Sequence, residues 1–143
     1  CAITSVKNIT LIDIVSSRML GAAGFLAHVF NNFLKWNISI DVIATSEVSV
    51  SLTVSSKDKL DGLISDLEAA SEVTVKKGRA IVTIICDAAH SSAILASGFS
   101  VLADEGINVQ MISQGASKVN ISIIVNEDEV EKTVQILHNA YFN

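Results

Sequence analysis

Hydrophobic and polar residues alternate strictly between residues 48 and 54, where valine and leucine at even positions are separated by serine and threonine. Successive side chains of a β-strand point to opposite faces of its sheet, so this pattern predicts a strand with one buried face. Residues 9–15, 38–44 and 73–75 are rich in β-branched residues and are also predicted to form strands.

Apolar residues recur at helical spacing in two segments between these strands. Leu26, Val29, Phe30 and Phe33 form one stripe, which predicts a helix that begins after a glycine-containing loop ending at Gly24. A second stripe runs through residues 60–67, and the polar residues 55–58 before it are expected to cap that helix. The resulting order is β-α-β-β-α-β, the ferredoxin-like split βαβ pattern.

The sequence also repeats itself. Residues 37–43 return as residues 106–112, and residues 48–54 return as residues 119–125. A spacing this long predicts two copies of one small domain rather than a solenoid. The second copy is predicted to have strands at 80–86, 107–113 and 118–125 and helices at 91–105 and 128–141.

The second copy lacks a fourth strand, whereas residues 2–7 have strand character and no partner in the first copy. An open sheet edge favours aggregation, so we expect the N-terminal strand to complete the second copy. The predicted fold class is α+β: two ferredoxin-like domains, the first (8–77) inserted into the second (78–143 plus strand 1–7).

Composition excludes several functions. The net charge of −5 over 143 residues argues against a nucleic-acid partner, and no apolar run is long enough to predict a membrane span. Cys1 and Cys86 have no metal-binding spacing; both are expected to be reduced in a cytoplasmic protein, with Cys86 as core filler. Because the chain opens on Cys1 rather than Met, we expect a piece of a larger protein.

Four runs resemble the regulatory region of lysine-sensitive aspartate kinases: residues 19–27 (MLGAAGFLA), 38–41 (ISID), 45–52 (TSEVSVSL) and 112–122 (ISQGASKVNIS). This resemblance covers almost the whole chain. It implies tandem ACT domains that sense L-lysine for feedback inhibition and associate as a homodimer. It also implies a kinase domain before Cys1 that would use ATP and Mg, whereas the regulatory region itself needs no cofactor.

The residues themselves support an amino-acid site in the first copy. The backbone N–H groups of Phe25 and Leu26, at the start of a helix, can receive a carboxylate. Asp41 interrupts an apolar strand and can pair with an ammonium group, and Glu47 offers a second negative charge. The complete candidate set, part of it implied only by the resemblance, is Met19, Ala22, Gly24, Phe25, Leu26, Ser39, Ile40, Asp41, Thr45, Ser46 and Glu47. Ala22 lacks the hydrogen-bonding side chain that some relatives carry there.

The second copy has residues 87–92 (DAAHSS) in place of the glycine-phenylalanine loop, so we expect no ligand there. Sequence reasoning identifies no catalytic residue and no metal ligands. Two alternatives stay open. One is a free-standing ACT subunit of another amino-acid biosynthetic enzyme, and the other is a small acylphosphatase-type enzyme that would hold phosphate with Arg18.

Overall fold

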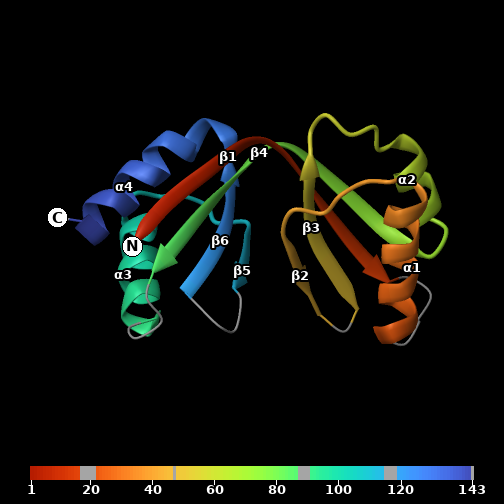
Figure 1. Ribbon diagram of the computed structural model, residues 1–143, viewed down its shortest axis with the longest axis horizontal. Helices are drawn as coiled ribbons and strands as arrows, with labels where there is room; N and C mark the ends of the chain where they lie inside the picture. Colours follow the sequence, from red (N-terminus) through yellow and green to blue (C-terminus); the bar gives the residue numbers. More distant parts are fainter. Residues whose placement is uncertain (17–21, 47, 87–90, 115–118, 143) are drawn as a thin grey trace. The chain divides into compact units, whose positions relative to one another are not determined.

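The computed structural model describes residues 1–16, 22–46, 48–86, 91–114 and 119–142. The elements are β1 (Ala2–Ser16), α1 (Ala22–Lys35), β2 (Ile43–Thr45), β3 (Ser49–Ser55), α2 (Asp61–Leu67), β4 (Ser71–Cys86), α3 (Ser91–Asp104), β5 (Met111–Gln114), β6 (Val119–Asn126), the 3-10 turn η2 (Glu127–Glu129) and α4 (Val130–Phe142) (Figure 1).

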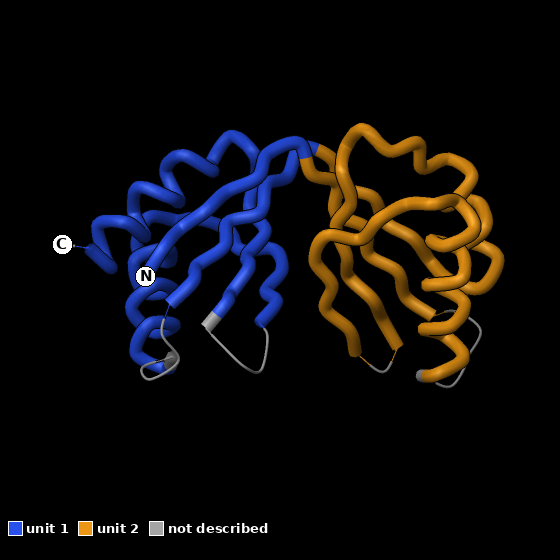
Figure 2. The backbone as a smooth tube through the Cα atoms, viewed as in Figure 1, with its two compact units in different colours: residues 1–8, 78–143 blue, residues 9–77 orange. Residues whose placement is uncertain are grey.

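The chain divides into two compact units (Figure 2). Unit 1 contains residues 1–8 and 78–143, and unit 2 contains residues 9–77. Strands β1 and β4 pass through both units, so each long strand contributes one part to each sheet. At the boundary, Asn8 and Gly78 have left-handed backbone φ angles of 60° and 70°.

In unit 2 the strand order is β2-β3-β1-β4, and the pairings β1–β3 and β2–β3 are antiparallel. Leu52 lies at the centre, opposite Ile12 on one side and Ile43 on the other. Helices α1 and α2 cover one face of this sheet (Figure 1). The buried core consists of Ile12, Ile14, Phe25, Val29, Phe33, Ile38, Val50, Leu52, Val54, Leu63 and Leu67.

Unit 1 has the equivalent strand order β1-β4-β6-β5, with β4–β6 and β5–β6 antiparallel. Its helices α3 and α4 lie on one face (Figure 1) over a separate core. The first half of β1 takes the place of the fourth strand, so unit 1 has the same ferredoxin-like topology as unit 2. The fold class predicted from the sequence is therefore confirmed.

Each unit contains a helical glycine directly beneath an aromatic ring. A Cβ atom on Gly62 would clash with the Trp36 ring, and one on Gly98 would clash with the Tyr141 hydroxyl. The Tyr141 hydroxyl in turn donates to the Ile94 carbonyl at 2.7 Å, which joins α4 to α3. These glycines are needed because the helix must let a large ring approach its backbone.

Some predicted boundaries are wrong. The strand expected at 38–44 is regular only over Ile43–Thr45, and α2 begins at Asp61 with Leu60 as an N-cap that makes no side-chain hydrogen bond. Residues 55–58 instead form a turn in which the Asp58 N–H donates to the Ser55 carbonyl at 3.1 Å. The strands expected at 73–75 and 80–86 belong to one continuous strand, β4.

The apolar stripe of α1 also differs from the prediction. Phe25, Val29 and Phe33 are buried, whereas Phe30 is 41% exposed. The buried face of α1 is therefore rotated from the predicted face, so that Phe25 packs toward the sheet and Phe30 does not. Phe30 and the 77% exposed Leu34 lie on its outer surface.

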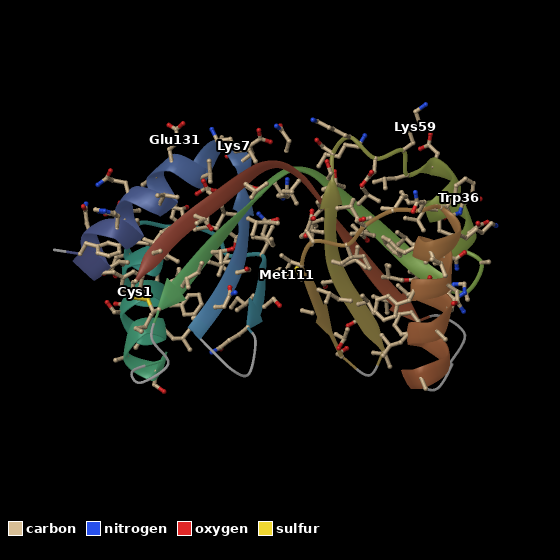
Figure 3. The ribbon with its side chains drawn as sticks, viewed as in Figure 1. Cys1, Lys7, Trp36, Lys59, Met111 and Glu131 are labelled. Carbon is tan, nitrogen blue, oxygen red and sulfur yellow. A yellow bond between two sulfur atoms is a disulfide. The ribbon has the colours of Figure 1, made fainter. Side chains whose placement is uncertain are left out.

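The prediction of two reduced cysteines is wrong. A disulfide joins Cys1 to Cys86, and both lie in unit 1 (Figure 3). The two residues are 85 positions apart in sequence, but β1 and β4 are neighbours in the sheet. The spacing of the two cysteines in the sequence does not show that their strands are neighbours, so it could not predict the disulfide.

Candidate effector-binding site

The described residues of the predicted site lie on three segments of unit 2. These are the first turn of α1, the irregular segment 39–41, and the turn between β2 and β3. Met19 and Glu47 lie outside the described residues, as does the side chain of Ala22.

The first turn of α1 places Gly24 at the surface and Phe25 in the core, where Phe25 is fully buried. Leu26 is half-buried against the same core. The helix begins at Ala22, two residues earlier than predicted. The N–H groups without a partner inside the helix therefore include those of Ala23 and Gly24, and Leu26 falls in the second turn. The helix N-terminus remains suited to an anion, with exposed Gly24 leaving room for one to approach.

Asp41 lies on the segment that leads into the edge strand β2. Its backbone N–H donates to the Thr53 carbonyl at 2.9 Å, and the next N–H, that of Val42, donates to the Thr53 hydroxyl at 3.0 Å. These bonds hold the backbone of Asp41 against β3 while its side chain stays exposed. Ser39, also exposed, and the half-buried Ile40 precede it.

The electrostatic environment of Asp41 disfavours its negative charge. Partial burial raises the pKa of its carboxyl above the usual value, and the nearby Asp58 carboxylate raises it further. Within the described part of the chain, no cation pairs with Asp41. A positively charged group placed here would relieve this repulsion.

Sequence reasoning missed Asp58. The polar residues 55–58 were predicted to be a helix cap, but they form the turn between β3 and α2. An aspartate in such a turn has the same sequence pattern as an aspartate that caps a helix. Its effect on Asp41 is seen only in the folded chain. The sequence feature that could have indicated its role is that Asp58 is an acidic residue in a segment, 55–58, that has no apolar periodicity.

The β2–β3 turn holds the remaining predicted residues. The Ser46 N–H donates to the Ser49 carbonyl at 2.9 Å, and the hydroxyls of Ser46 and Ser49 are 2.6 Å apart. Thr45 lies opposite Val50 and is exposed. The start of β3 is bonded to the end of β1, since the Ser16 N–H donates to the Val48 carbonyl at 2.8 Å. The turn therefore lies at the same end of unit 2 as the first turn of α1 (Figure 1).

The structure does not bring Asp41 and the β2–β3 turn together within one chain. Asp41 and Thr45 are four residues apart on an extended edge segment, which at roughly 3.3 Å per residue is about 13 Å. One end of this edge offers a carboxylate, and the other offers a helix N-terminus and hydroxyls. The predicted site residues thus fall into two groups along one sheet edge, and we call these groups half-sites.

Unit 1 carries a neutral residue at the position equivalent to Asp41. The Gln110 N–H donates to the Ile124 carbonyl at 2.8 Å, as the Asp41 N–H does to Thr53. The Gln110 side chain accepts from Arg79 Nε at 2.6 Å and donates to Asn126 Oδ1 at 2.9 Å. An amide engaged in this way offers no negative charge to a ligand.

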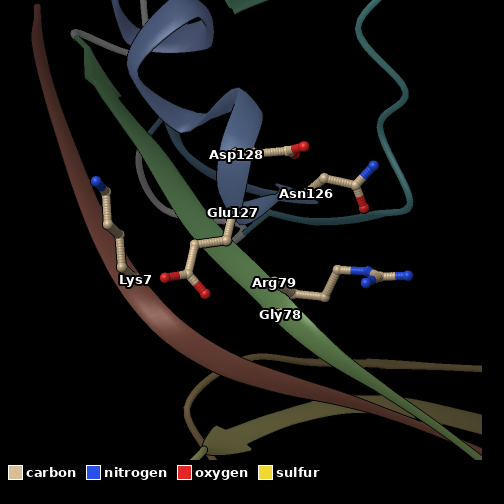
Figure 4. A pocket seen from close by; sticks show the side chains of 6 residues that line it. All are labelled: Lys7, Gly78, Arg79, Asn126, Glu127 and Asp128. Atoms are coloured by element: carbon tan, nitrogen blue, oxygen red, sulfur yellow. The ribbon is translucent and has the colours of Figure 1, made fainter.

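A shallow depression elsewhere in unit 1 is lined by Lys7, Gly78, Arg79, Asn126, Glu127 and Asp128. Lys7 and Arg79 extend in opposite directions from it (Figure 4). Lys7 pairs with Glu131 at 3.4 Å, and Arg79 donates to Gln110. The charged groups around this depression do not converge on one point. The acidic residues there begin η2, where a helical N-terminus favours negative charge.

Among the described residues, no cluster of histidine, cysteine, aspartate or glutamate could hold a metal ion. None of the described helices is long and apolar enough to cross a membrane.

Comparison with known proteins assigns the family. A family model described as the ACT domain matches residues 12–64 and 87–141, one match in each half of the sequence. Fold and family model together define a protein with two ACT domains. The chain is 52% identical to aspartokinase 1, chloroplastic, of Arabidopsis thaliana over 95% of its own length. It spans only about a quarter of the length of such curated relatives, 26% in this case.

Two solved structures are similar over nearly the whole chain. A C-terminal regulatory domain of aspartate kinase from Porphyromonas gingivalis is 32% identical, with a TM-score of 0.86, and the match covers 99% of this chain and 97% of that one. E. coli aspartokinase III in complex with lysine and aspartate, in the T-state, is 35% identical, with a TM-score of 0.80, over 100% of this chain and 33% of that one. The chain therefore belongs to the aspartate kinase family, as a regulatory region of two ACT domains. This confirms the resemblance inferred from the sequence.

Proposed function

We propose that this region binds L-lysine through unit 2 and thereby inhibits the kinase domain of its parent protein. The observation that carries the proposal is the position of Asp41, an exposed carboxylate whose pKa is raised by partial burial and by Asp58. An ammonium group bound there would form a charge-assisted hydrogen bond and remove the repulsion between the two carboxylates. The lysine complex of the E. coli relative supports the choice of amino acid.

The carboxylate of the effector would lie at the start of α1, near Gly24. Free N–H groups and the helix dipole favour an anion there, and the adjacent hydroxyls of Thr45 and Ser46 can donate to it. Ile40 and Met19 would contact the aliphatic part of lysine. The proposed set is completed by Ala22, Phe25, Leu26, Ser39 and Glu47.

Because the two half-sites are about 13 Å apart along the edge of one chain, a complete site needs a second copy. We propose a homodimer in which the open β2 edges of two chains meet, so that Asp41 of one chain faces the α1 N-terminus of its partner. β2 is an edge strand, and edge strands can pair with the strands of another chain. Light scattering of the chain with and without lysine tests this arrangement, and a monomer at all micromolar concentrations would contradict it.

The parent protein is proposed to be an aspartate kinase that uses ATP and Mg in a domain outside this chain. Lysine can inhibit that domain only by binding one conformational state better than another, and such coupling is typically worth about 1–3 kcal/mol. The name of the Arabidopsis relative places that protein in the chloroplast. We therefore propose that the parent acts inside the cell, either in the cytoplasm, as the sequence predicts, or in a plastid.

The two alternatives from the sequence have less support. Arg18, on which an acylphosphatase site would depend, lies outside the described residues. A free-standing ACT subunit has no observation that favours it over a kinase regulatory region.

Inhibition of the parent kinase tests the regulatory role. Lysine should inhibit the wild-type enzyme, and Asp41→Asn should raise the lysine concentration needed while leaving activity without lysine unchanged. Glu72→Gln, which removes an exposed carboxylate from β4, is the matched control and should keep normal inhibition. Equal inhibition of the wild type and Asp41→Asn would contradict the proposal.

A further inference from the structure

The disulfide of unit 1 lies outside the proposed lysine site. Cys1 is exposed, whereas Cys86 is 8% exposed and belongs to the core of unit 1. The bond joins the residue before β1 to the last residue of β4 (Figure 3). Disulfides inside cells are uncommon and are often redox-sensing when they occur.

The strand segment next to Cys1 has few other attachments. Within residues 2–7, Ile3 is the one side chain packed against the core of unit 1, and the other five residues are exposed. The second half of β1 differs, since Ile9, Leu11, Ile12 and Ile14 are all buried. The first half is also an edge of the sheet of unit 1, bordered by β4 on one side only.

The ion pair at the other end of this segment adds little. Lys7 Nζ lies 3.4 Å from Glu131 Oε1, and the two side chains are 47% and 88% exposed. Such solvated pairs contribute little to stability. Residues 2–7 are therefore held to unit 1 mainly by their backbone pairing with β4, by Ile3 and by the disulfide.

We propose that Cys1–Cys86 is a redox modification site, and that its reduction by a dithiol releases residues 2–7 from the sheet of unit 1. A thiolate of the reductant attacks the sulfur of exposed Cys1, and Cys86 leaves as a thiolate. The second thiol of the reductant then attacks the mixed disulfide and frees Cys1. The two protein sulfurs gain two electrons and two protons, and the reductant becomes a disulfide.

Release would affect unit 1 and not unit 2. The edge of β4 in unit 1 would lose its partner, while β4 remains paired with β6 through contacts such as Ile84–Ile121. Unit 2 has its own core and contains neither cysteine. A reducing signal would thus change the regulatory region without touching the residues proposed to bind lysine.

Hydrogen exchange of the full chain, before and after reduction by dithiothreitol, tests the proposal. We expect no free thiols before reduction and two after it. Exchange should become at least 10-fold faster in residues 2–7 and in those amides of residues 79–86 that face β1, with unit 2 unchanged. The melting temperature should fall by about 5–10 °C, as expected for loss of a disulfide from a chain of this size.

The double variant Cys1→Ser/Cys86→Ser is the matched control. It should show the fast exchange of the reduced wild type and no response to dithiothreitol. If the double variant does not fold, Cys1→Ser alone removes the same bond and leaves the buried Cys86 in place. Two free thiols in the untreated protein would overturn the proposal. So would unchanged exchange of residues 2–7 after complete reduction, or equal acceleration in both units.

Discussion

The backbone N–H of Asp41 donates to the carbonyl of Thr53 at 2.9 Å, and the same bond recurs in unit 1 between Gln110 and Ile124 at 2.8 Å. Asp41 and Gln110 therefore occupy equivalent backbone positions in the two units. The side chains differ, because the carboxylate of Asp41 makes no ion pair with the described residues, whereas the Gln110 amide is bonded on both sides. We therefore expect the ligand site in unit 2.

Asp41→Asn should weaken lysine binding roughly 10- to 100-fold, because a hydrogen bond to a charged group is worth about 1.5–3 kcal/mol. The variant keeps the backbone bond to Thr53, so the fold should be unchanged. Calorimetric titration measures the loss. An affinity within twofold of the wild type would show that Asp41 does not hold the ammonium group.

The raised pKa of Asp41 makes a separate prediction about stability. As pH rises, the unfolded chain releases the Asp41 proton first, at its ordinary pKa near 3.8, and the folded chain releases it later. The contribution of this group is thus present below that pKa and is lost as pH rises through the higher folded value. At pH 7, Asp41→Asn should therefore raise the free energy of unfolding slightly, by a few tenths of a kcal/mol because the site is partly solvated.

Urea unfolding of the wild type and Asp41→Asn, at pH 7 and below pH 3.5, checks this sign. The difference between them should shrink at low pH, where the wild-type carboxyl is protonated. A variant less stable than the wild type at pH 7 would show that Asp41 has a structural partner. Weaker binding together with higher stability would separate a ligand-binding role from a structural one.

Gly24→Asp should abolish lysine binding, because its carboxylate would occupy the place proposed for that of the ligand. An acidic residue in the first turn of α1 suits the helix dipole, so the variant should remain folded. Gly24→Asn has nearly the same size without the charge and should bind more weakly than the wild type but better than Gly24→Asp. Equal binding by all three proteins, measured by calorimetry, would contradict this placement.

Gln110→Ala should destabilise unit 1 without changing the affinity for lysine. The substitution removes one hydrogen bond from Arg79 and one from Asn126, and each such bond contributes about 0.5–1.5 kcal/mol net. Thermal unfolding measures the first effect and calorimetry the second. A change in lysine affinity as large as that of Asp41→Asn would place a ligand in unit 1.

The fold was predictable because its signals are local and repeated. Alternation over residues 48–54 defined a half-buried strand, and its second copy at 119–125 revealed the duplication. The unpaired strand at residues 2–7 indicated how the two copies interlock. These signals arise because the buried face of a helix or strand is lined by apolar residues, and the spacing of apolar residues can be seen in the sequence.

What could not be predicted depends on contacts between distant segments. The Cys1–Cys86 bond requires the pairing of β1 with β4, and the effect of Asp58 on Asp41 requires the turn before α2. Phe30 is exposed because α1 has more than one apolar stripe at helical spacing, and the sequence does not show which stripe faces the sheet. In the site, residue types were readable from the sequence, whereas the separation of Asp41 from the β2–β3 turn was not.

Calorimetric titration of this chain with lysine, threonine, methionine and S-adenosylmethionine tests the central claim most directly. We predict that lysine binds with no more than one site per chain, that Asp41→Asn weakens this binding, and that Glu72→Gln leaves it unchanged. Threonine binding without lysine binding would contradict the choice of effector and leave a regulatory site in place. No binding of any of the four compounds, by a chain shown to be folded and dimeric, would contradict the account.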